Sequence, residues 1–467
     1  MSQSQDHRQA GRPTKQVRLG AHFPGVNHNT VWSDPQAGSH IAFGSFRELA
    51  QSAERGRFDF FFLAEGLRLR ERHGKIHDLD VVGRPDTLPV LAALAAVTEH
   101  LGLVGTINAT FNEPYELARQ FASLDLLSDG RAGWNVVTSS DAFTGENFRR
   151  GGYLARTDRY VRAADSVGTA RELWDSWQAD AVVADLDHFT RPGAISPFSH
   201  HSEQFDISGV FDTPRPVQGH PVIFQAGDSA DGRDFGARTA DAIFGRWFDT
   251  AERRRTSYAD FKQRAASFGR QPEELKIFPG VSFALGDTEE EAQHNDYRIR
   301  RAQITPQTAL NLLGQVWNRD LSDLDPDGPL PTVDPDRGGP SVVAGQSRRN
   351  DEDGLADRYR TLAREKGLSI RELMIEVQAS RTFVGTPRQV ARQLADAVAD
   401  EQADGFILVP HLTPSGLDGF VDTVVPELQD LGAYRTDYEG GTLRENLGLP
   451  EAGRQPIADP LSHRAAS

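Results

Sequence analysis

The sequence predicts an α/β protein that folds as one (β/α)8 barrel, a TIM barrel, with insertions. Apolar stretches of strand length alternate with amphipathic stretches of helix length along most of the 467 residues. The strand candidates are apolar throughout instead of alternating with polar residues, which is typical of parallel strands covered on both faces. Eight such strands with helices between them favour a closed barrel over an open sheet.

The predicted elements follow one another in strand–helix order. The eight strands are expected at residues 17–23, 58–64, 101–108, 131–138, 221–225, 241–244, 276–283 and 405–409. The clearest helices are expected at residues 46–57, 88–100, 114–127 and 158–178. The third of these helices begins at Pro114, in a first turn where the missing N–H costs little.

Several segments fall outside this rhythm. Residues 1–16 are polar and are expected to form a disordered tail without a secretory signal, so that the barrel domain spans residues 17–432. A polar excursion is expected at 179–209, before strand five, and a larger insertion at 302–380, between strands seven and eight. Within the insertion, 322–354 is rich in Pro, Gly and Asp, with little capacity to pack. A long loop of this kind is usually functional or disordered, and here it would overhang the catalytic mouth as a lid. Residues 433–467 form a C-terminal extension, expected to serve subunit contact in a homo-oligomer.

The amino-acid composition excludes or disfavours several classes of function. The net charge of −16, from 67 acidic and 51 basic residues, disfavours binding to nucleic acid or to anionic membrane surfaces. The absence of cysteine excludes disulfides, thiolate catalysis and cysteine-bound metals. No apolar run is long enough to span a bilayer. These features predict a soluble, cytoplasmic protein of the size of an enzyme.

Candidate site residues are those that directly follow the predicted strands, because the active site of such a barrel lies at the carboxyl ends of its strands. These positions hold His28 and Trp32 after strand one, Glu65, Arg68 and Arg70 after strand two, Thr106 in strand three, Asn135 in strand four, and Gly227, Asp228 and Ser229 after strand five.

The Gly227–Asp228–Ser229 segment opens a predicted helix. Free backbone N–H groups, a hydroxyl and the positive end of the helix dipole suit a phosphate group. An ordinary helix cap made by Asp228 or Ser229 would have the same sequence, so the segment alone leaves both interpretations open.

Other chemistries find less support. The tripeptide Asn27-His28-Asn29 lacks the His-x-His of hydrolytic metal barrels, so no catalytic metal is expected. A glycosidase needs two carboxylates in the site, and Glu65 has no convincing partner. No glycine-rich dinucleotide motif or Walker sequence follows a strand, which argues against an NAD(P)H domain within the chain.

Six motifs occur in a recognisable order. They are FFLAE at 61–65, VGTI at 104–107, FASLDLLSDGRAGWNVVTS at 121–139, ENF at 146–148, DRY at 158–160 and QAGDS at 225–229. Together they resemble the bacterial-luciferase-like flavin monooxygenases, in the branch of nitrilotriacetate and dibenzothiophene-sulfone monooxygenases. The resemblance covers about residues 17 to 432, and 121–139 is its most specific part.

The resemblance implies a luciferase-like TIM barrel that binds FMN. It assigns the FMN phosphate to Gly227, Asp228, Ser229 and Tyr160. The family often has His four residues before this Tyr, where the chain has Arg156, a residue that can also pair with phosphate. The family's usual Asp after strand two is Glu65 here, whose extra methylene changes its reach toward the flavin edge, and Thr106 and Asn135 would line the flavin ring.

The implied activity is that of an FMNH2-dependent monooxygenase, the oxygenase component of a two-component system. It would insert one oxygen atom of O2 into a small organic substrate, with reduced FMN supplied by a separate NAD(P)H-dependent flavin reductase. His28 is the candidate for the polar group nearest the reacting oxygen. Trp32, Arg68 and Arg70 are candidates for substrate binding, with the arginines expected to bind an anionic group.

Two alternatives stay open. A deazaflavin (F420)-dependent oxidoreductase would use the same barrel without oxygen, and a flavin-binding protein without catalytic activity would share the cofactor site. The sequence does not distinguish the substrate.

Overall fold

Eight parallel strands close into the predicted barrel. The computed structural model describes residues 15–25, 29–72, 74–76, 83–139, 142–148, 156–336, 338, 343–344, 354–378 and 383–452. The strands pair in the order β1-β15-β11-β10-β9-β6-β5-β2, and β2 pairs with β1 to close the sheet. They are β1 (Arg18–His22), β2 (Phe60–Leu63), β5 (Gly102–Asn108), β6 (Ala132–Val137), β9 (Val222–Gln225), β10 (Ala242–Gly245), β11 (Lys276–Val281) and β15 (Gly405–Leu408). Each lies within a predicted strand or departs from one by a single residue, so the predicted fold class is confirmed.

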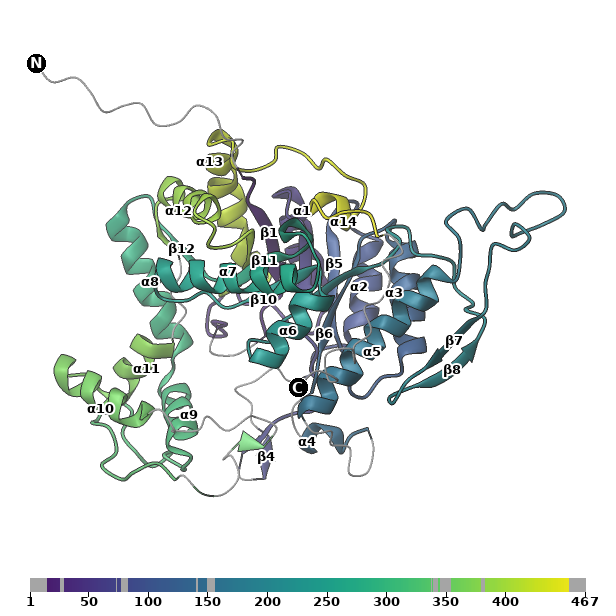
Figure 1. Cartoon of the computed structure of the whole chain (residues 1–467). Coiled ribbons are helices and arrows are strands. Elements are labelled where there is room, and N and C mark those ends of the chain that lie inside the picture. Colours follow the sequence, from purple (N-terminus) through teal and green to yellow (C-terminus); the bar gives the residue numbers. More distant parts are fainter. Residues whose placement is uncertain are drawn as a thin grey trace, which may run out of the picture.

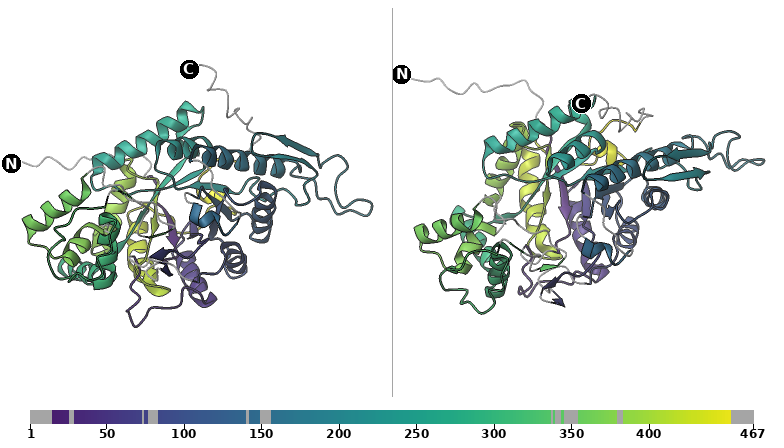
Figure 2. Two further views of the ribbon diagram at one scale, coloured as in Figure 1. Left: turned by 90° about the horizontal axis from the view of Figure 1, so that it is seen from below. Right: turned by 60° about the horizontal axis from the view of Figure 1, so that its bottom comes forward.

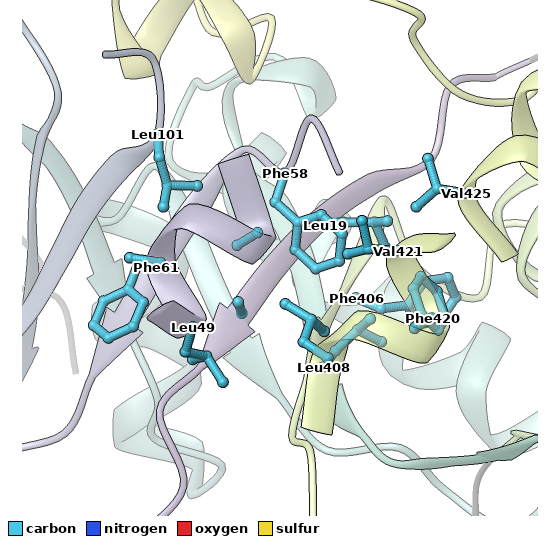
Figure 3. Packing of buried hydrophobic residues seen from close by; sticks show 14 of the residues in the cluster. Leu19, Leu49, Phe58, Phe61, Leu101, Phe406, Leu408, Phe420, Val421 and Val425 are labelled. Atoms are coloured by element: carbon cyan, nitrogen blue, oxygen red, sulfur yellow. The ribbon is translucent and has the colours of Figure 1, made fainter. Parts of the chain in front are cut away.

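Helices surround the barrel on its outer face (Figure 1). They are α1 (Phe43–Arg55), α2 (Thr87–Ala95), α3 (Pro114–Leu127), α5 (Arg156–Asp175), α6 (Ala230–Thr239), α7 (Ala251–Ser267), α12 (Pro387–Ala399) and α13 (Val425–Asp430), the last preceded by a π-helical stretch at Phe420–Val424. Short 3-10 turns lie at Pro272–Glu274 and Ser415–Leu417. Outward side chains such as Leu19 and Phe61 pack against this layer, and Figure 3 shows them beside Leu49 of α1. Alternate strand residues point outward, which explains why the strands are apolar throughout.

Aromatic rings fill the barrel interior. The ring of Phe60 meets those of Phe224 and Phe278 edge to face, with centroids 4.9 and 5.3 Å away. Room for Phe60 comes from Gly20 on the neighbouring strand, where a Cβ atom would lie 2.3 Å from the ring. The interior is therefore a packed core and not a channel, and ligands must bind at an end of the barrel.

The insertion between β11 and β15 is a folded subdomain. It contains α8 (Glu289–Gln303), α9 (Pro306–Trp317), α10 (Leu355–Lys366) and α11 (Ile370–Gln378), and it is flanked by the short paired strands β12 (Phe283–Leu285) and β14 (Phe383–Gly385). Helices α9, α10 and α11 share a hydrophobic cluster of their own.

The Pro- and Gly-rich stretch of this insertion, residues 322–354, was expected to pack poorly. The part of it that the structure describes is packed against the insertion's hydrophobic cluster. Leu321 is buried in the cluster, Leu324 and Leu330 pack against it, and the carbonyl of Gly328 accepts a hydrogen bond from the N–H of Ile370. The expectation of a loose segment was wrong for residues 322–336, because a few leucines among the prolines are enough to anchor it.

The polar excursion at 179–209 carries an antiparallel hairpin of β7 (Phe198–His201) and β8 (Asp206–Gly209). In Figure 2 it projects from the barrel on the side opposite the insertion. The loop that precedes the hairpin exposes Leu186 completely and two thirds of the surface of Phe189.

The C-terminal segment completes the barrel. The short helix α14 (Leu443–Asn446) lies at the amino-terminal end of the strands, where Leu443, Leu447 and Leu449 join the interior cluster. The backbone N–H of Leu443 donates to the carbonyl of Gly130, and the Arg444 guanidinium pairs with Asp241 at 2.9 Å. Residues 433–452 are thus part of the barrel's core packing, which the sequence did not predict. No helix in the described part of the chain is both long and apolar enough to cross a membrane.

We predict that Leu443→Ala lowers the free energy of unfolding by about 2–5 kcal/mol, because it leaves a cavity at the closed end of the barrel. Denaturant unfolding followed by circular dichroism measures the loss. Leu186→Ala is the matched control, since the Leu186 side chain is fully exposed and its removal is expected to change stability by less than about 0.5 kcal/mol. Equal effects of the two substitutions would contradict the role of α14.

Candidate functional site

The carboxyl end of the barrel, opposite α14, gathers the polar residues. At this end Glu65 follows β2 and Asn108 ends β5, the adjacent strand. The Glu65 carboxyl accepts hydrogen bonds from the backbone N–H of Asn108 at 3.1 Å and from its amide Nδ2 at 3.2 Å. Burial raises the pKa of Glu65 to about 7, and the charge of Asp86 adds to the effect, whereas the Asn108 hydrogen bonds oppose it. Glu65 is therefore a carboxyl group that exchanges its proton near neutral pH.

Thr106 and Asn135 form a second pair inside the barrel. They are register partners on β5 and β6, and the Asn135 Nδ2 donates to the Thr106 hydroxyl at 2.9 Å. Both side chains are buried, and the Asn135 Oδ1 has no hydrogen-bond partner among the described residues. A buried acceptor without a donor is costly, so this oxygen is available to a ligand N–H group.

The segment after β9 forms a narrow cradle around a hydroxyl pair. Ser229 caps α6 by accepting from the N–H of Gly232 at 3.2 Å, and its hydroxyl lies 3.5 Å from that of Tyr160 on α5. A Cβ atom on Gly227 or on Gly232 would lie 3.0 or 2.8 Å from the Tyr160 hydroxyl, so glycine at these positions lets the hydroxyl pack close to the backbone. The helix-cap interpretation is confirmed, since Ser229 caps α6, and the phosphate interpretation stays a prediction.

Asp228 lies in this segment but is already paired. Its carboxylate accepts from the Arg233 Nε at 3.0 Å, and Arg233 also reaches Asp260 at 2.9 Å. The Arg233 charge offsets that of Asp228, so the Asp228 side chain does not leave a free negative charge beside the cradle.

A half-buried histidine and a half-buried arginine lie where the first two barrel strands end. His22 ends β1 with its ring stacked on Phe62 at 5.7 Å, and its Nδ1 lacks a partner among the described residues. Burial and the nearby Arg84 charge lower the pKa of His22 to about 3, so the ring is neutral. Arg84 donates to the carbonyls of Ala64 and Pro24, the residues that follow β2 and β1.

The predicted substrate residues lie on the loops above the barrel. Trp32 is partly exposed, with its ring 4.8 Å from that of His40. Arg68 is paired with Glu146 at 2.7 Å and approaches Glu71 at 3.6 Å. Arg70 is half-buried on the same loop. Two predicted residues, His28 and the side chain of Arg156, lie outside the described part of the structure.

Several site residues escaped the sequence-based selection. Asn108 and Gln225 end strands β5 and β9, and their strand-end positions were visible in the sequence, which assigned them no role. Arg84 and Arg159 were not among the candidates; Arg159 is buried and donates to the Ser139 carbonyl at 2.6 Å. No local signal marks Arg84 or Arg159, because their roles arise from burial. No cluster of metal-binding side chains occurs among the residues with a described position.

Comparisons with known proteins agree on one family. A sequence profile described as luciferase-like monooxygenase matches residues 23–404. The chain is 40% identical over 448 residues to N-acetyl-S-(2-succino)cysteine monooxygenase of Bacillus subtilis (strain 168), covering 93% of this chain and 97% of that protein. It is also 40% identical over 456 residues to nitrilotriacetate monooxygenase component A of Aminobacter aminovorans, with the same coverages. Among solved structures, riboflavin lyase with modified FMN and the substrate riboflavin matches with a TM-score of 0.75 and 29% identity, covering 94% of this chain and 97% of that one.

We predict that Glu65→Gln changes how stability depends on pH. In the unfolded chain Glu65 titrates near its ordinary value of 4.5, and in the folded protein near 7, so the folded state binds more protons between these values. The contribution of Glu65 to stability therefore falls as pH rises through this window, and glutamine removes this dependence. Melting temperatures from pH 5 to 8 should show the variant gaining on the wild-type protein as pH rises. A difference that does not change with pH would contradict the prediction.

Proposed function

The chain belongs to the luciferase-like monooxygenase family, and we propose that it is the oxygenase component of a two-component system that uses reduced FMN. A family profile that matches most of the chain and two monooxygenases at 40% identity support a monooxygenase over an F420-dependent hydride transfer or a binding protein without catalysis. One of these relatives is designated component A, which agrees with dependence on a second protein. That second protein would be an NAD(P)H-dependent flavin reductase.

The observation that carries the proposal is that two features of the site match two parts of FMN. The glycine-lined cradle at Ser229 and Tyr160 presents hydroxyls and helix N–H groups, which suit the phosphate. No described residue donates to the Asn135 Oδ1, and the flavin ring offers an N–H group. The residues present therefore fit FMN, with Arg156 as a further proposed partner of the phosphate and Thr106 beside Asn135 at the ring.

Bound reduced FMN supplies the electrons that activate dioxygen, and the protein supplies position, polarity and dryness. Glu65, held by Asn108, can hold or release a proton near neutral pH. His28 is the proposed polar group nearest the reacting oxygen. The insertion is the proposed lid, and its Gln303 donates to the carbonyl of Asn29 on the loop after β1 at 2.8 Å. Exclusion of water protects the reactive species from hydrolysis.

Trp32, Arg68 and Arg70 are the proposed substrate residues on the rim. Arg68 would have to exchange Glu146 for a substrate anion, because its guanidinium is already paired in this structure. This pairing makes the loop a weaker anion site than its run of arginines suggests.

The purified chain should not oxidise NADH or NADPH, since the sequence contains no dinucleotide-binding motif. It should consume oxygen when FMN, NADH and a flavin reductase are added. An oxygen electrode measures the rate, and the reductase with FMN but without this chain gives the background. Rapid NAD(P)H oxidation by the chain alone would contradict the two-component assignment.

Ser229→Asp should weaken FMN binding while riboflavin still binds. Aspartate keeps the cap of α6 but places a negative charge against the phosphate. Loss of a charge-assisted hydrogen bond alone corresponds to roughly a ten- to hundredfold loss of affinity. Fluorescence titration with FMN and riboflavin measures both affinities, and Ser123→Asp on the outer helix α3 serves as a control. Equal losses for the two flavins would place the phosphate elsewhere.

A further inference from the structure

Arg84 is held at the carboxyl end of the barrel by two backbone carbonyls. Its Nη1 donates to the Ala64 carbonyl at 2.9 Å and its Nη2 to the Pro24 carbonyl at 3.3 Å. The guanidinium lies 5.9 Å from the centre of the Phe23 ring. A guanidinium has five N–H groups, and the buried Nε–H of Arg84 has no acceptor among the described residues. The guanidinium of Arg84 is thus fixed in orientation, but not all of its N–H groups have an acceptor among the described residues.

Among the described residues, the charge of Arg84 has no counter-ion. No carboxylate of the described residues lies within 4.0 Å of its guanidinium, whereas Arg68 pairs with Glu146 and Arg72 with Asp320 at the same mouth. The two acidic residues that neighbour Arg84 and Ala64 in sequence are engaged elsewhere: Asp86 caps α2, and Glu65 binds Asn108.

The groups of the described residues that lie closest to Arg84 do not neutralise it. His22, the titratable group that faces it, is neutral. Burial lowers the pKa of Arg84 to about 10, so the side chain still carries its charge at neutral pH. A half-buried cation without a partner among the described residues is costly, and two neutral carbonyls compensate for only part of that cost. We expect an unpaired cation of this kind at a place where a bound ligand supplies the negative charge.

Arg84 and the phosphate cradle lie on opposite sides of the mouth. The cradle follows β9, which is four strands from β1 around the barrel and three from β2. An FMN phosphate at Ser229 therefore cannot also neutralise Arg84. The anion has to belong to a second group, on the far side of the site from the phosphate.

We propose that Arg84 binds a carboxylate group of the substrate. The inference rests on the proposed monooxygenase function and names its substrate class as organic acids. The planar fork of arginine matches a carboxylate, and its anchoring by Ala64 and Pro24 reduces the ordering cost of binding. The anionic ring of reduced flavin is the other possible source of negative charge, and the experiment separates the two.

The test uses the full-length, FMN-loaded protein and pairs of short organic acids with their primary amides, such as succinate with succinamide. Thermal-shift titration at fixed ionic strength gives the affinity for each compound. We expect acids to bind more tightly than their amides. Arg84→Gln should weaken acid binding roughly ten- to hundredfold and leave the amides unchanged.

Two further variants separate charge recognition from structural support. Arg84→Lys keeps the charge without the fork and should retain part of the preference for acids. Arg72→Gln removes an arginine of the same mouth that is already paired, and should leave the preference intact. The proposal would be overturned if Arg84→Gln still bound acids more tightly than amides to the same degree as the wild-type protein. It would also be overturned if the wild-type protein bound no acid more tightly than the corresponding amide.

The source of the anion is tested with flavins alone. If Arg84→Gln instead weakens binding of reduced FMN and reduced riboflavin equally and leaves acid binding unchanged, the partner of Arg84 is the flavin ring, and the substrate assignment is overturned. Oxygen consumption by the wild-type protein with reduced FMN is measured separately. If the protein consumes oxygen but no acid binds more tightly than its amide, only the substrate inference is rejected. If the protein does not consume oxygen with reduced FMN, the proposed function is rejected.

Discussion

Closure of the parallel sheet is the constraint on which the rest of the structure depends. Each barrel strand is hydrogen-bonded to two neighbours, so its register is set on both sides. The register of β5 with β6 places Thr106 opposite Asn135, and the pairing of β2 with β5 brings Glu65 within reach of Asn108. Because all eight strands point the same way, every loop that follows a strand opens at one end. The site is a consequence of this geometry.

Both ends of the barrel bury polar groups. At the amino-terminal end the charges are matched, with Arg444 on Asp241 and Arg435 on Asp59, although the Nε atoms of both arginines lack a partner among the described residues. At the carboxyl end, the Nδ1 of His22, the Oδ1 of Asn135 and the Nε of Arg84 have no partner in the described part of the chain. Unsatisfied buried groups reduce stability, and those at the carboxyl end lie where a barrel of this kind binds its ligands.

Burial also sets the chemistry of the ionisable groups at this end. Removal from water favours the neutral forms of Glu65 and His22, and it leaves Arg84 as a charge that no carboxylate among the described residues pairs with. A neutral histidine, a carboxyl group that titrates near 7 and a fixed cation thus lie at the end of the barrel where β1 and β2 end. None of these states follows from the residue types alone.

The sequence by itself determined the eight strands and the barrel, because apolar runs are local features. Strand-end positions and the family motifs also predicted Thr106, Asn135, Tyr160 and Ser229 as site residues, and this assignment remains a prediction. It also determined the family, through motifs that keep their order. Tertiary structure alone decided the Glu65–Asn108 pair, the neutralisation of Arg68 by Glu146 and the isolation of Arg84. It also decided that the C-terminal leucines fill the far end of the barrel. These features depend on contacts between residues far apart in the chain and on the removal of water around them, and neither distance nor burial is written in a local pattern.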